Sequence, residues 1–469
     1  MKKYDEGLKS IRELLGQEGV VEKDNHEPYI TEWRGLWRGN CSLIARPAST
    51  QEVSGVVKIC NEHNISIVPQ GGNTGLVGGA VPNGGIVIST QRMQRIIDVD
   101  PINMTLTCEA GCILKNLQTA SENAGRLFPL SLAAEGSCSI GGNLSTNAGG
   151  IQVLRYGNTR DLVLGIEVVL PNGEVWNGLR ALRKDNTGYD IKHLFVGGEG
   201  TLGIITSAIL KLFPAHKQKE TALVAVSKVS DAIELLSKIT SAAGDSLTAF
   251  ELMNNYSFNL PIKYINGIRQ PFTNKHNWYI LIELTSPQEG RNLRAIIEKT
   301  LLTAVDQKVV EDAILAETLN QAQDFWKIRE SIPEAQGEEG GSIKNDITVP
   351  ISKIPEFLNR ANKIVETIIP KIRPVSFGHA GDGNIHYNLT QPEDMDRKTF
   401  LNQWHIITNA INEIVADLNG SFSAEHGIGQ LKIKELQQYR PGIEVQLMKI
   451  IKHSIDPKNI MNPGKLFDL

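Results

Sequence analysis

Glycine gathers in three clusters in the first half of this 469-residue chain, and this distribution constrains the fold more than any other feature. The clusters lie at 71–85, 136–157 and 188–203, whereas glycine is sparse from 215 to about 336. Because glycine has no side chain, its backbone N–H groups can approach a bound anion closely. The distribution therefore predicts a domain that binds a ligand through its backbone, followed by a domain of a different kind.

Helix and strand signals alternate around the glycine clusters. Ser49 lies three residues before Glu52, a capping box that predicts a helix running to about His63. Apolar runs bounded by turn residues predict strands in the same half of the chain. These strands lie at 65–69, at 84–90, at 162–176 as a pair around a Pro-Asn-Gly turn, and at 201–214, where Pro214 ends the run.

The second half mixes element types. Helical spacing occurs at 229–244 and 289–304, a strand pattern at 278–286, and a long helical pattern after residue 390. Such a mixture is typical of an α+β domain with an antiparallel sheet.

The first two glycine clusters suit a nucleotide. Residues 71–79 directly follow a predicted strand, so their N–H groups can form a nest for a pyrophosphate. The alternative is a flexible turn. Residues 136–150 combine glycine with hydroxyl and amide side chains, which can surround the polar edge of a ring. The alternative there is a tight connection between strands.

The third cluster contains Gly-Glu-Gly-Thr-Leu-Gly at 198–203, a literal G-x-G-x-x-G. In dinucleotide-binding folds a helix follows that motif. Here a β-rich run follows, so we reject that fold.

Two histidines flank a turn late in the chain. His379 and His386 enclose Gly-Asp-Gly-Asn, and the segment indicates two short strands around a turn. Simple alternation would put these residues on opposite faces, but the turn or a bulge can reset the phase. With Glu425 they offer two imidazoles and a carboxylate, a common ligand set for Zn²⁺. The alternative is histidines that are packed or exposed without a metal.

Several motifs together resemble a known family. PQGGNTGLVGGAVP, GSCSIGGNLSTNAGG, RKDNTGYD and GGEGTLGIIT resemble the FAD domain of vanillyl-alcohol-oxidase-type flavoproteins. More narrowly, the chain resembles the FAD-linked 2-hydroxy-acid dehydrogenases of that family, the branch of D-2-hydroxyglutarate dehydrogenase, D-lactate dehydrogenase and the glycolate oxidase flavoprotein subunit. The resemblance implies an α+β fold with a two-subdomain FAD-binding domain at 1–214 and a substrate cap with an antiparallel sheet at 215–414. A C-terminal segment at 415–469 would complete the FAD domain and the active site between the domains.

The resemblance also implies residues that bind FAD. Gly71, Gly72, Asn73, Thr74 and Gly75 would hold the pyrophosphate. The flavin would be lined by Gly136, Ser139, Gly142, Asn143, Thr146, Ala148 and Gly150, with Asn462 nearby, and Gly203, Ile204 and Ile205 would lie towards the adenine-ribose side. Some relatives bind flavin covalently through a histidine, and residues 71–82 contain none, so we expect non-covalent FAD.

For the substrate, the resemblance implies metal ligands His379, His386 and Glu425, which would hold a divalent metal, with Zn²⁺ the first expectation. His426 would be the catalytic base, since an imidazole titrates near pH 6.5, at about the working pH. Asn388 would hydrogen-bond the substrate, and Arg329 and Lys344 would bind its carboxylates. The alternative for the last two is solvated surface charge.

The implied reaction is oxidation of a D-2-hydroxy acid to the 2-oxo acid, with metal assistance and hydride transfer to flavin N5. D-2-hydroxyglutarate is favoured, but relatives acting on it have a threonine where this chain has Pro333, so D-lactate or glycolate is the alternative. A different class, a non-catalytic flavin subunit of an electron-transfer complex, fits the histidine set less well.

Composition restricts the partners. A net charge of -4, from 48 basic and 52 acidic residues, draws the chain neither to nucleic acid nor to an anionic membrane. Five cysteines without a C-x-x-C pair favour reduced thiols, and we expect a cytoplasmic protein, with peripheral membrane docking left open. Neither a signal peptide nor a transmembrane run is expected. No haem or iron–sulfur pattern occurs, so electrons would leave to an electron-transfer flavoprotein, a quinone or a cytochrome. A homodimer is expected from the family alone.

Overall fold

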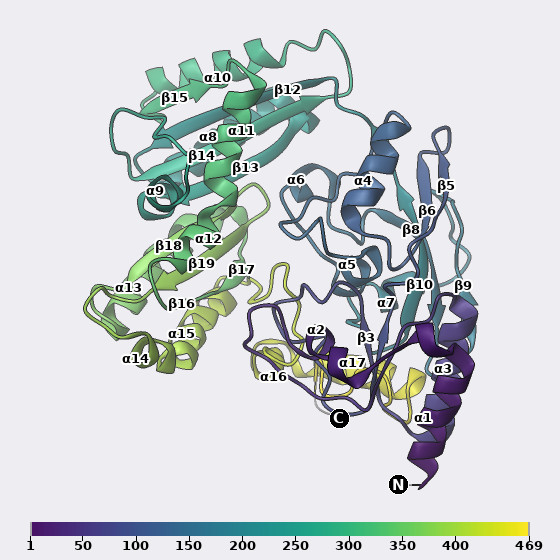
Figure 1. The fold of residues 1–469 in the computed structure, drawn as a ribbon. Coiled ribbons are helices and arrows are strands. Elements are labelled where there is room, and N and C mark those ends of the chain that lie inside the picture. The colour runs from purple at the N-terminus through teal and green to yellow at the C-terminus, as the bar shows by residue number, and fades with distance from the viewer. Residues whose placement is uncertain (1, 468–469) are drawn as a thin grey trace. The chain divides into compact units, whose positions relative to one another are not determined.

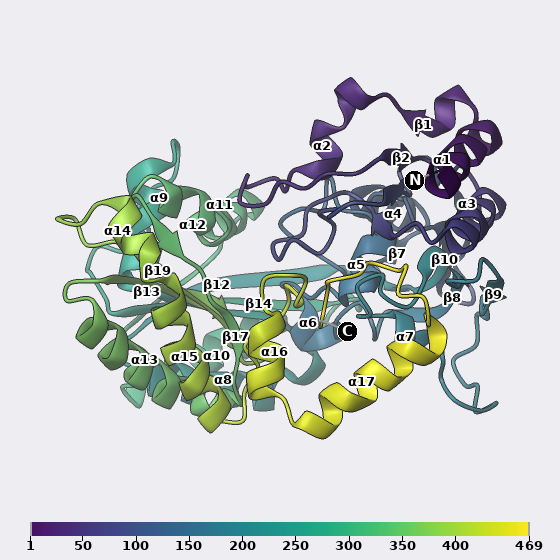
Figure 2. The same ribbon diagram turned by 90° about the horizontal axis from the view of Figure 1, so that it is seen from below.

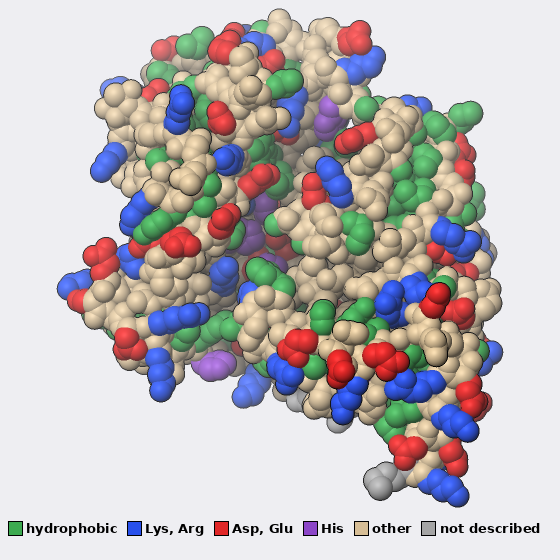
Figure 3. Space-filling view, in the orientation of Figure 1, with side chains coloured by type: hydrophobic (Ala, Val, Ile, Leu, Met, Phe, Trp, Pro, Cys, Tyr) green, Lys and Arg blue, Asp and Glu red, His purple; other side chains and the backbone are tan. Residues whose placement is uncertain are grey.

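The computed structural model describes residues 2–467, which divide into two compact units. Unit 1 comprises the residues up to Gly149, Tyr156–Ala215 and the residues from Glu425 onward. Unit 2 comprises Gly150–Arg155 and His216–Ala424. Within the described residues no helix has the length and apolarity needed to cross a membrane. Figure 3 shows acidic and basic side chains interspersed on the face in view, as expected for a chain of nearly balanced charge.

Unit 1 contains a small sheet of strand order β1-β2-β4-β3, in which β4 runs parallel to both β2 and β3. Helices α1 and α3 lie side by side (Figure 1) and bury Ile11 and Val53 in one core with Ile86. The predicted N-cap is confirmed, since Ser49 Oγ accepts from the N–H of Glu52 at 3.2 Å and α3 ends at His63. The second half of the predicted capping box differs, because Glu52 Oε2 accepts from the N–H of Ala48 at 2.7 Å instead of that of Ser49. The elements are α1 (Lys2–Leu15), β1 (Val20–Val21), α2 (Glu27–Ile30), β2 (Leu43–Ala45), α3 (Thr50–His63), β3 (Ile67–Gln70) and β4 (Ile86–Ser89).

The second sheet of unit 1 is antiparallel, with strand order β5-β6-β10-β8-β9. β10 directly follows the G-x-G-x-x-G motif, which confirms that no helix opens there. The elements are β5 (Ile96–Asp100), β6 (Thr105–Glu109), α4 (Leu114–Asn123), β7 (Arg126–Leu127), α5 (Ile140–Thr146), α6 (Val153–Tyr156), β8 (Val163–Val169), β9 (Val175–Asn177), α7 (Lys192–Phe195), β10 (Ile204–Lys211) and β11 (Phe213–Pro214). α6 straddles the boundary between the units.

The chain returns to unit 1 after residue 424. Helices α16 (Ile433–Tyr439) and α17 (Gly442–Ile455) follow, and Figure 2 shows α17 in yellow beside α7. The ammonium of Lys452 is buried and donates to the carbonyl oxygens of Thr201 and Met461, both at 2.8 Å. The N–H of Asn462 donates to the Ile67 carbonyl at 2.7 Å, so this segment pairs beside β3.

Unit 2 is built on one antiparallel sheet, as predicted. Its order is β15-β12-β14-β13-β18-β19-β16, and β17 also pairs with β19. The strands are β12 (Gln218–Val226), β13 (Leu247–Asn254), β14 (Trp278–Ser286), β15 (Asp312–Leu315), β16 (Ser342–Ile343), β17 (Asp346–Thr348), β18 (Arg373–His379) and β19 (Asn384–Thr390).

Helices cover both faces of this sheet. α8 (Val229–Ala243), α10 (Leu293–Asp306), α13 (Ile354–Ile368) and α15 (Trp404–Asp417) contribute to the core on one face. α9 (Asn255–Tyr264), α11 (Leu319–Glu330) and α12 (Ile332–Gly337) cover the other, which we call the α11 face. The single long helix predicted after residue 390 is instead α14 (Arg397–Asn402) and α15, broken at Gln403. Because Phe400 and Ile407 both enter the same core, the apolar period continues across the break and conceals it in the sequence.

Candidate functional site

A cleft in unit 1 collects most of the predicted nucleotide-binding residues. Its volume, open solvent included, is about 900 Å³. The predicted residues that line it are Gly71, Gly72, Asn73, Thr74, Gly75, Ser139, Gly142, Asn143, Thr146, Gly203, Ile204, Ile205 and His426. The cleft therefore joins all three glycine clusters to the segment that carries His426.

Two glycines are needed where the first cluster meets the second. A Cβ on Gly71 would lie 2.0 Å from Ser139 Oγ, and one on Gly72 would lie 2.1 Å from the Ser137 carbonyl oxygen. By contrast, a Cβ on Gly75 would have no atom within 4 Å. Protein packing thus explains the first two glycines, whereas the space beside Gly75 on the cleft wall is open.

Polar atoms without partners gather in this cleft. Gln70 Oε1, Thr90 Oγ1 and Ser139 Oγ are buried, and none has a hydrogen-bond partner among residues 2–467. Leaving such groups unpaired costs about 1–3 kcal/mol each. A ligand rich in donors and acceptors would satisfy them, so the cleft fits the pyrophosphate and ring edge of a flavin nucleotide.

Four predicted FAD residues lie outside the cleft lining: Gly136, Ala148, Gly150 and Asn462. Gly136 is exposed, with no atom within 4 Å of a built Cβ. Asn462 Nδ2 donates to the carbonyl oxygens of Gly79 at 3.0 Å and Glu199 at 2.8 Å, while its buried Oδ1 has no partner among the described residues. Their roles stay predictions.

Glu199 is a lining residue that sequence reasoning missed. Its carboxylate is almost fully buried and accepts from the backbone N–H groups of Ile428 at 2.8 Å and Gly429 at 2.7 Å. Burial raises the pKa of this carboxyl, and the two N–H groups oppose that shift. Because Ile428 lies two residues after His426, Glu199 fixes the loop that presents His426 to the cleft.

In unit 2, the α11 face brings His379 and His386 together. Phe377 pairs with His386 across the β18–β19 hairpin, and directly paired residues point to one face. Since Phe377 and His379 are two residues apart on β18, all three side chains share the α11 face. The two imidazole centroids are 5.5 Å apart. The predicted convergence is confirmed. The turn sets a register in which odd-numbered residues of β18 pair with even-numbered residues of β19, so His379 and His386 lie on the same face.

A buried carboxylate joins two of the predicted residues. Glu251 on β13 is 0% exposed. Its Oε1 lies 2.6 Å from His379 Nδ1, and its Oε2 accepts from Arg329 Nε at 2.7 Å. Burial alone would raise the pKa of Glu251, but the charges of His379 and Arg329 and their hydrogen bonds lower it to about 2. Glu251 was not predicted, because one glutamate in the apolar run FELMN carries no signal by itself.

The second histidine also faces a carboxylate, since His386 Nδ1 lies 3.5 Å from Asp346 Oδ1. Glu425 directly follows Ala424, whose N–H donates to the Asp346 carbonyl oxygen at 3.4 Å. The ligand atoms of His379, His386 and Glu425 all lie within 4.8 Å of one another. Two imidazoles and a carboxylate at this spacing fit a divalent metal chemically.

The predicted substrate residues occupy different settings. Arg329 on α11 is 6% exposed, so the surface-charge alternative is wrong for it. Its guanidinium carbon lies 4.7 Å from the Phe377 ring centroid. Asn388 shares the face of His386, as predicted, and donates from Nδ2 to Gln336 Oε1 at 3.1 Å. Lys344 is half-buried between β16 and β17.

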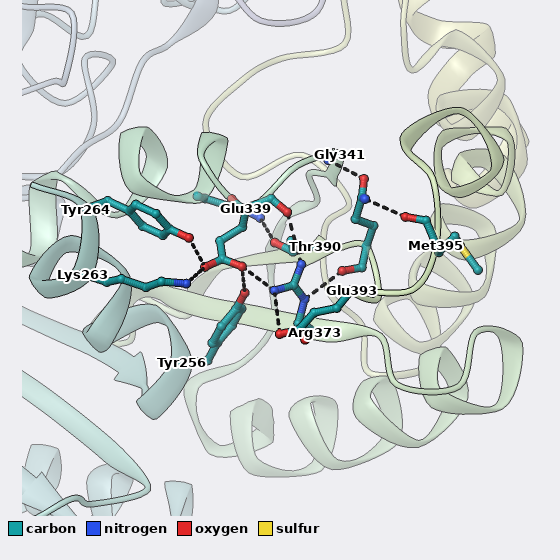
Figure 4. Close-up of polar contacts among 11 residues, drawn as sticks. Tyr256, Lys263, Tyr264, Glu339, Gly341, Arg373, Thr390, Glu393 and Met395 are labelled. Atoms are coloured by element: carbon teal, nitrogen blue, oxygen red, sulfur yellow. Dashed lines mark hydrogen bonds and ion pairs between the residues drawn. The ribbon is translucent and has the colours of Figure 1, made fainter.

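A polar network anchors the segment that leads to Lys344. The Glu339 side chain is 7% exposed and accepts from Lys263 Nζ at 2.7 Å, Tyr264 Oη at 2.6 Å and Tyr256 Oη at 3.1 Å (Figure 4). Arg373 Nη1 also donates to it. Although burial opposes ionisation, these hydrogen bonds lower the pKa of Glu339 to about 2. The network ties residue 339 to α9 and β18.

Two family models match most of the chain. The model described as FAD binding domain matches residues 41–178, and the one described as FAD linked oxidases, C-terminal domain, matches residues 215–466.

Whole-chain relatives agree with these matches. The chain is 40% identical over 458 residues to the mitochondrial D-2-hydroxyglutarate dehydrogenase of Arabidopsis thaliana, covering 97% of this chain and 80% of the relative. It is 37% identical over 443 residues to the D-2-hydroxyglutarate dehydrogenase of Xanthomonas citri pv. viticola, covering 94% and 92%. A Saccharomyces cerevisiae relative, named D-2-hydroxyglutarate–pyruvate transhydrogenase, is 36% identical over 98% of this chain and 94% of its own length.

Among solved structures, p-cresol methylhydroxylase with substrate bound has a TM-score of 0.78 at 17% identity, covering 100% of this chain and 98% of that chain. An alkyldihydroxyacetonephosphate synthase has a TM-score of 0.72 at 19% identity, covering 98% and 84%. At these identities the likeness concerns the fold, and it confirms the predicted vanillyl-alcohol-oxidase-type architecture.

Proposed function

This chain belongs to the family of FAD-linked oxidases and is an FAD-dependent oxidoreductase that acts on a CH–OH group, and from that premise we propose that it oxidises D-2-hydroxyglutarate to 2-oxoglutarate. The names of the relatives from Arabidopsis thaliana and Xanthomonas citri support this substrate. When bound, FAD accepts the two electrons of the oxidation, and a divalent metal polarises the substrate hydroxyl.

One observation carries the proposal: Arg329, His379 and His386 share the α11 face of unit 2, with Glu251 joining the first two. A buried guanidinium binds a carboxylate through paired N–H groups, and imidazoles hold a metal beside the hydroxyl. A 2-hydroxy acid carries its hydroxyl next to its carboxylate. The α11 face therefore offers both a group that binds the carboxylate and groups that hold a metal beside the hydroxyl.

The remaining roles belong to other residues of the chain. His426 takes the hydroxyl proton on an imidazole nitrogen, the general-base role that histidine side chains most often fill. Asn388 hydrogen-bonds the substrate, and Lys344 attracts the distal carboxylate of a dicarboxylic acid. His379, His386 and Glu425 would hold the metal, with Zn²⁺ the first choice for this donor set. The residues that line the cleft of unit 1 would hold the flavin, and they would bind it non-covalently.

Oxidation of D-lactate or glycolate is the second candidate. Pro333 is exposed in the first turn of α12 and cannot donate a hydrogen bond. A five-carbon dicarboxylate therefore loses one polar contact at this position, whereas a monocarboxylate needs none there.

Anaerobic titration of the yellow protein with hydroxy acids tests the proposal. We expect D-2-hydroxyglutarate to bleach the flavin at lower concentration than D-lactate or glycolate, and a chelator to slow the bleaching. Bleaching by D-lactate but not by D-2-hydroxyglutarate would transfer the assignment to the second candidate. Reoxidation of the bleached protein by pyruvate, a quinone, a cytochrome or an electron-transfer flavoprotein would then identify the acceptor.

A further inference from the structure

Glu251 lies between two residues of the proposed site, and we propose that it is a positioning residue for both. It holds the imidazole of His379 for a metal and the guanidinium of Arg329 for a substrate carboxylate, at one fixed spacing. This inference rests on the proposed function and adds to it the group that links metal binding to substrate binding.

The sheet itself places Glu251. Glu251 on β13 pairs directly with His379 on β18, so the two side chains extend from adjacent strands on the same face of the sheet. Arg329 approaches from α11, which packs its residues Phe325 and Ile328 onto that face. Each oxygen of the carboxylate serves one partner, at 2.6 Å and 2.7 Å. The contact thus spans two strands and a helix, and all three groups are at least nine-tenths buried.

The bond to His379 decides which nitrogen can bind a metal. A carboxylate only accepts hydrogen bonds, so Nδ1 of His379 must carry the proton. The lone pair then lies on Nε2, which is the nitrogen that can bind a metal. Carboxylates that orient ligating histidines in this way contribute roughly 10- to 100-fold to metal affinity.

The bond to Arg329 leaves the end of its guanidinium for a ligand. Glu251 takes the Nε–H, and the Phe377 ring packs against one face of the group. Within residues 2–467, the two terminal NH₂ groups of Arg329 have no hydrogen-bond acceptor. Together they can donate two parallel hydrogen bonds to a carboxylate. The plane of those donors is set by Glu251.

A purely structural salt bridge is the competing explanation, and Glu283 provides the matched control. Glu283 also lies on the α11 face, buried on β14, where its Oε2 accepts from Trp326 Nε1 of α11 at 2.8 Å and pairs with Lys219 at 2.6 Å. It therefore holds the same helix to the same sheet with one cation and one N–H donor. It contacts neither His379 nor Arg329.

The experiment compares Glu251→Gln and Glu283→Gln in the full-length, FAD-loaded protein. Glutamine keeps the shape but presents an NH₂ group to one of the two donors, so either the guanidinium reorients or the imidazole turns away or moves its proton to Nε2. After metal removal, Zn²⁺ is titrated against a chromophoric chelator. We expect Glu251→Gln to bind Zn²⁺ about 10- to 100-fold more weakly and to raise KM for the hydroxy acid about tenfold. Glu283→Gln should match the wild type within about twofold, and both should keep FAD.

Glu251→Asp is measured alongside as a second variant, because it keeps the charge but cannot reach both partners at once. It should fall between the wild type and Glu251→Gln in Zn²⁺ affinity. Equal losses in Glu251→Gln and Glu283→Gln, or wild-type affinity in both Glu251 variants, would overturn the inference. A wild type that oxidises hydroxy acids without taking up Zn²⁺ overturns it too, yet leaves the dehydrogenase activity standing. A wild type whose flavin no hydroxy acid bleaches refutes the proposed function itself.

Discussion

The carboxylate of Glu199 accepts a hydrogen bond from the backbone N–H of Ile428 at 2.8 Å, although 229 positions separate the two residues in sequence. The second oxygen accepts from the next N–H, that of Gly429, at 2.7 Å. Glu199 belongs to the G-x-G-x-x-G segment, which does not open a helix. Its function in unit 1 is to hold the loop that carries His426.

Replacing Glu199 by alanine should therefore affect both stability and turnover. One buried and one half-buried N–H group, those of Gly429 and Ile428, would lose their partner, which we expect to lower the free energy of unfolding by about 2–4 kcal/mol. At saturating FAD, kcat should fall because His426 is no longer fixed. Urea unfolding and steady-state kinetics measure the two effects, and Glu122→Ala on the exposed side of α4 is the control. Wild-type kcat in Glu199→Ala would show that the loop holds its place without the carboxylate.

Two glycines of the first cluster should respond differently to alanine. In Gly72→Ala the new methyl group would lie 2.1 Å from the Ser137 carbonyl oxygen, so the apoprotein itself should be destabilised. In Gly75→Ala the methyl group meets no protein atom within 4 Å, so the apoprotein should keep its stability while FAD affinity falls at least about tenfold. Thermal unfolding of the apoprotein and flavin titration separate the cases. Unchanged FAD affinity in Gly75→Ala would remove this residue from the pyrophosphate site.

His426→Ala should lose turnover but keep its flavin. A general base contributes about 10²–10⁴-fold to a rate, so we expect a loss of that size in kcat. His453→Ala, an exposed histidine of α17, should behave as the wild type. Rates are measured with protein of equal FAD content, and near-normal turnover in His426→Ala would assign the base to another residue.

FAD should leave the protein on denaturation. Residues 71–82 contain no histidine that could form a covalent bond to the flavin. After acid precipitation the yellow colour should remain in the supernatant, where absorbance quantifies it. Colour in the washed pellet would contradict non-covalent binding.

The Glu339 network should make unit 2 sensitive to acid. Its hydrogen bonds lower the pKa of Glu339 from an ordinary 4.5 to about 2, against the effect of burial. A carboxyl whose pKa is lower in the folded state stabilises the fold above its unfolded pKa, and this contribution disappears as the pH falls from about 4.5 to about 2. Glu339→Gln should therefore be about 2 kcal/mol less stable at pH 7 and should lose less on acidification.

Urea unfolding at pH 7, 5 and 3 checks this, with Glu393→Gln as the control because that side chain is 87% exposed. An identical loss of stability with falling pH in wild type and Glu339→Gln would show that Glu339 does not carry the acid sensitivity.

Local elements of the fold were predictable, whereas their pairing was not. The Ser49 N-cap of α3 and the Pro-Asn-Gly turn between β8 and β9 depend on residues near each other in sequence, and both are confirmed. The insertion of β10 between β6 and β8 depends on contacts across the whole unit. No window of sequence contains that information. The break at Gln403 was missed for the same reason, since the core imposes it.

The candidate site shows the same limit. His379 and His386 were recognisable from their spacing around a glycine turn, yet only the hairpin register places both on one face. Nothing in the sequence FWKIRE indicates that Arg329 is buried, and nothing in FELMN indicates that Glu251 has a functional role. Their roles appear only when β13, β18 and α11 pack together, because the fold must bring His379 and Arg329 to the Glu251 carboxylate before it can bind both.

The return of the chain to unit 1 has a consequence for biosynthesis. Unit 2 is nearly continuous in sequence, so it can finish folding while the ribosome is still translating the remainder. Unit 1 lacks the Met461 segment that pairs beside β3, the buried ammonium of Lys452 and the loop of His426 until residues 425–467 have emerged. Unit 1, which binds the nucleotide, thus completes its folding last. A prematurely terminated chain would contain a folded unit 2 and a unit 1 whose flavin-binding cleft is incomplete.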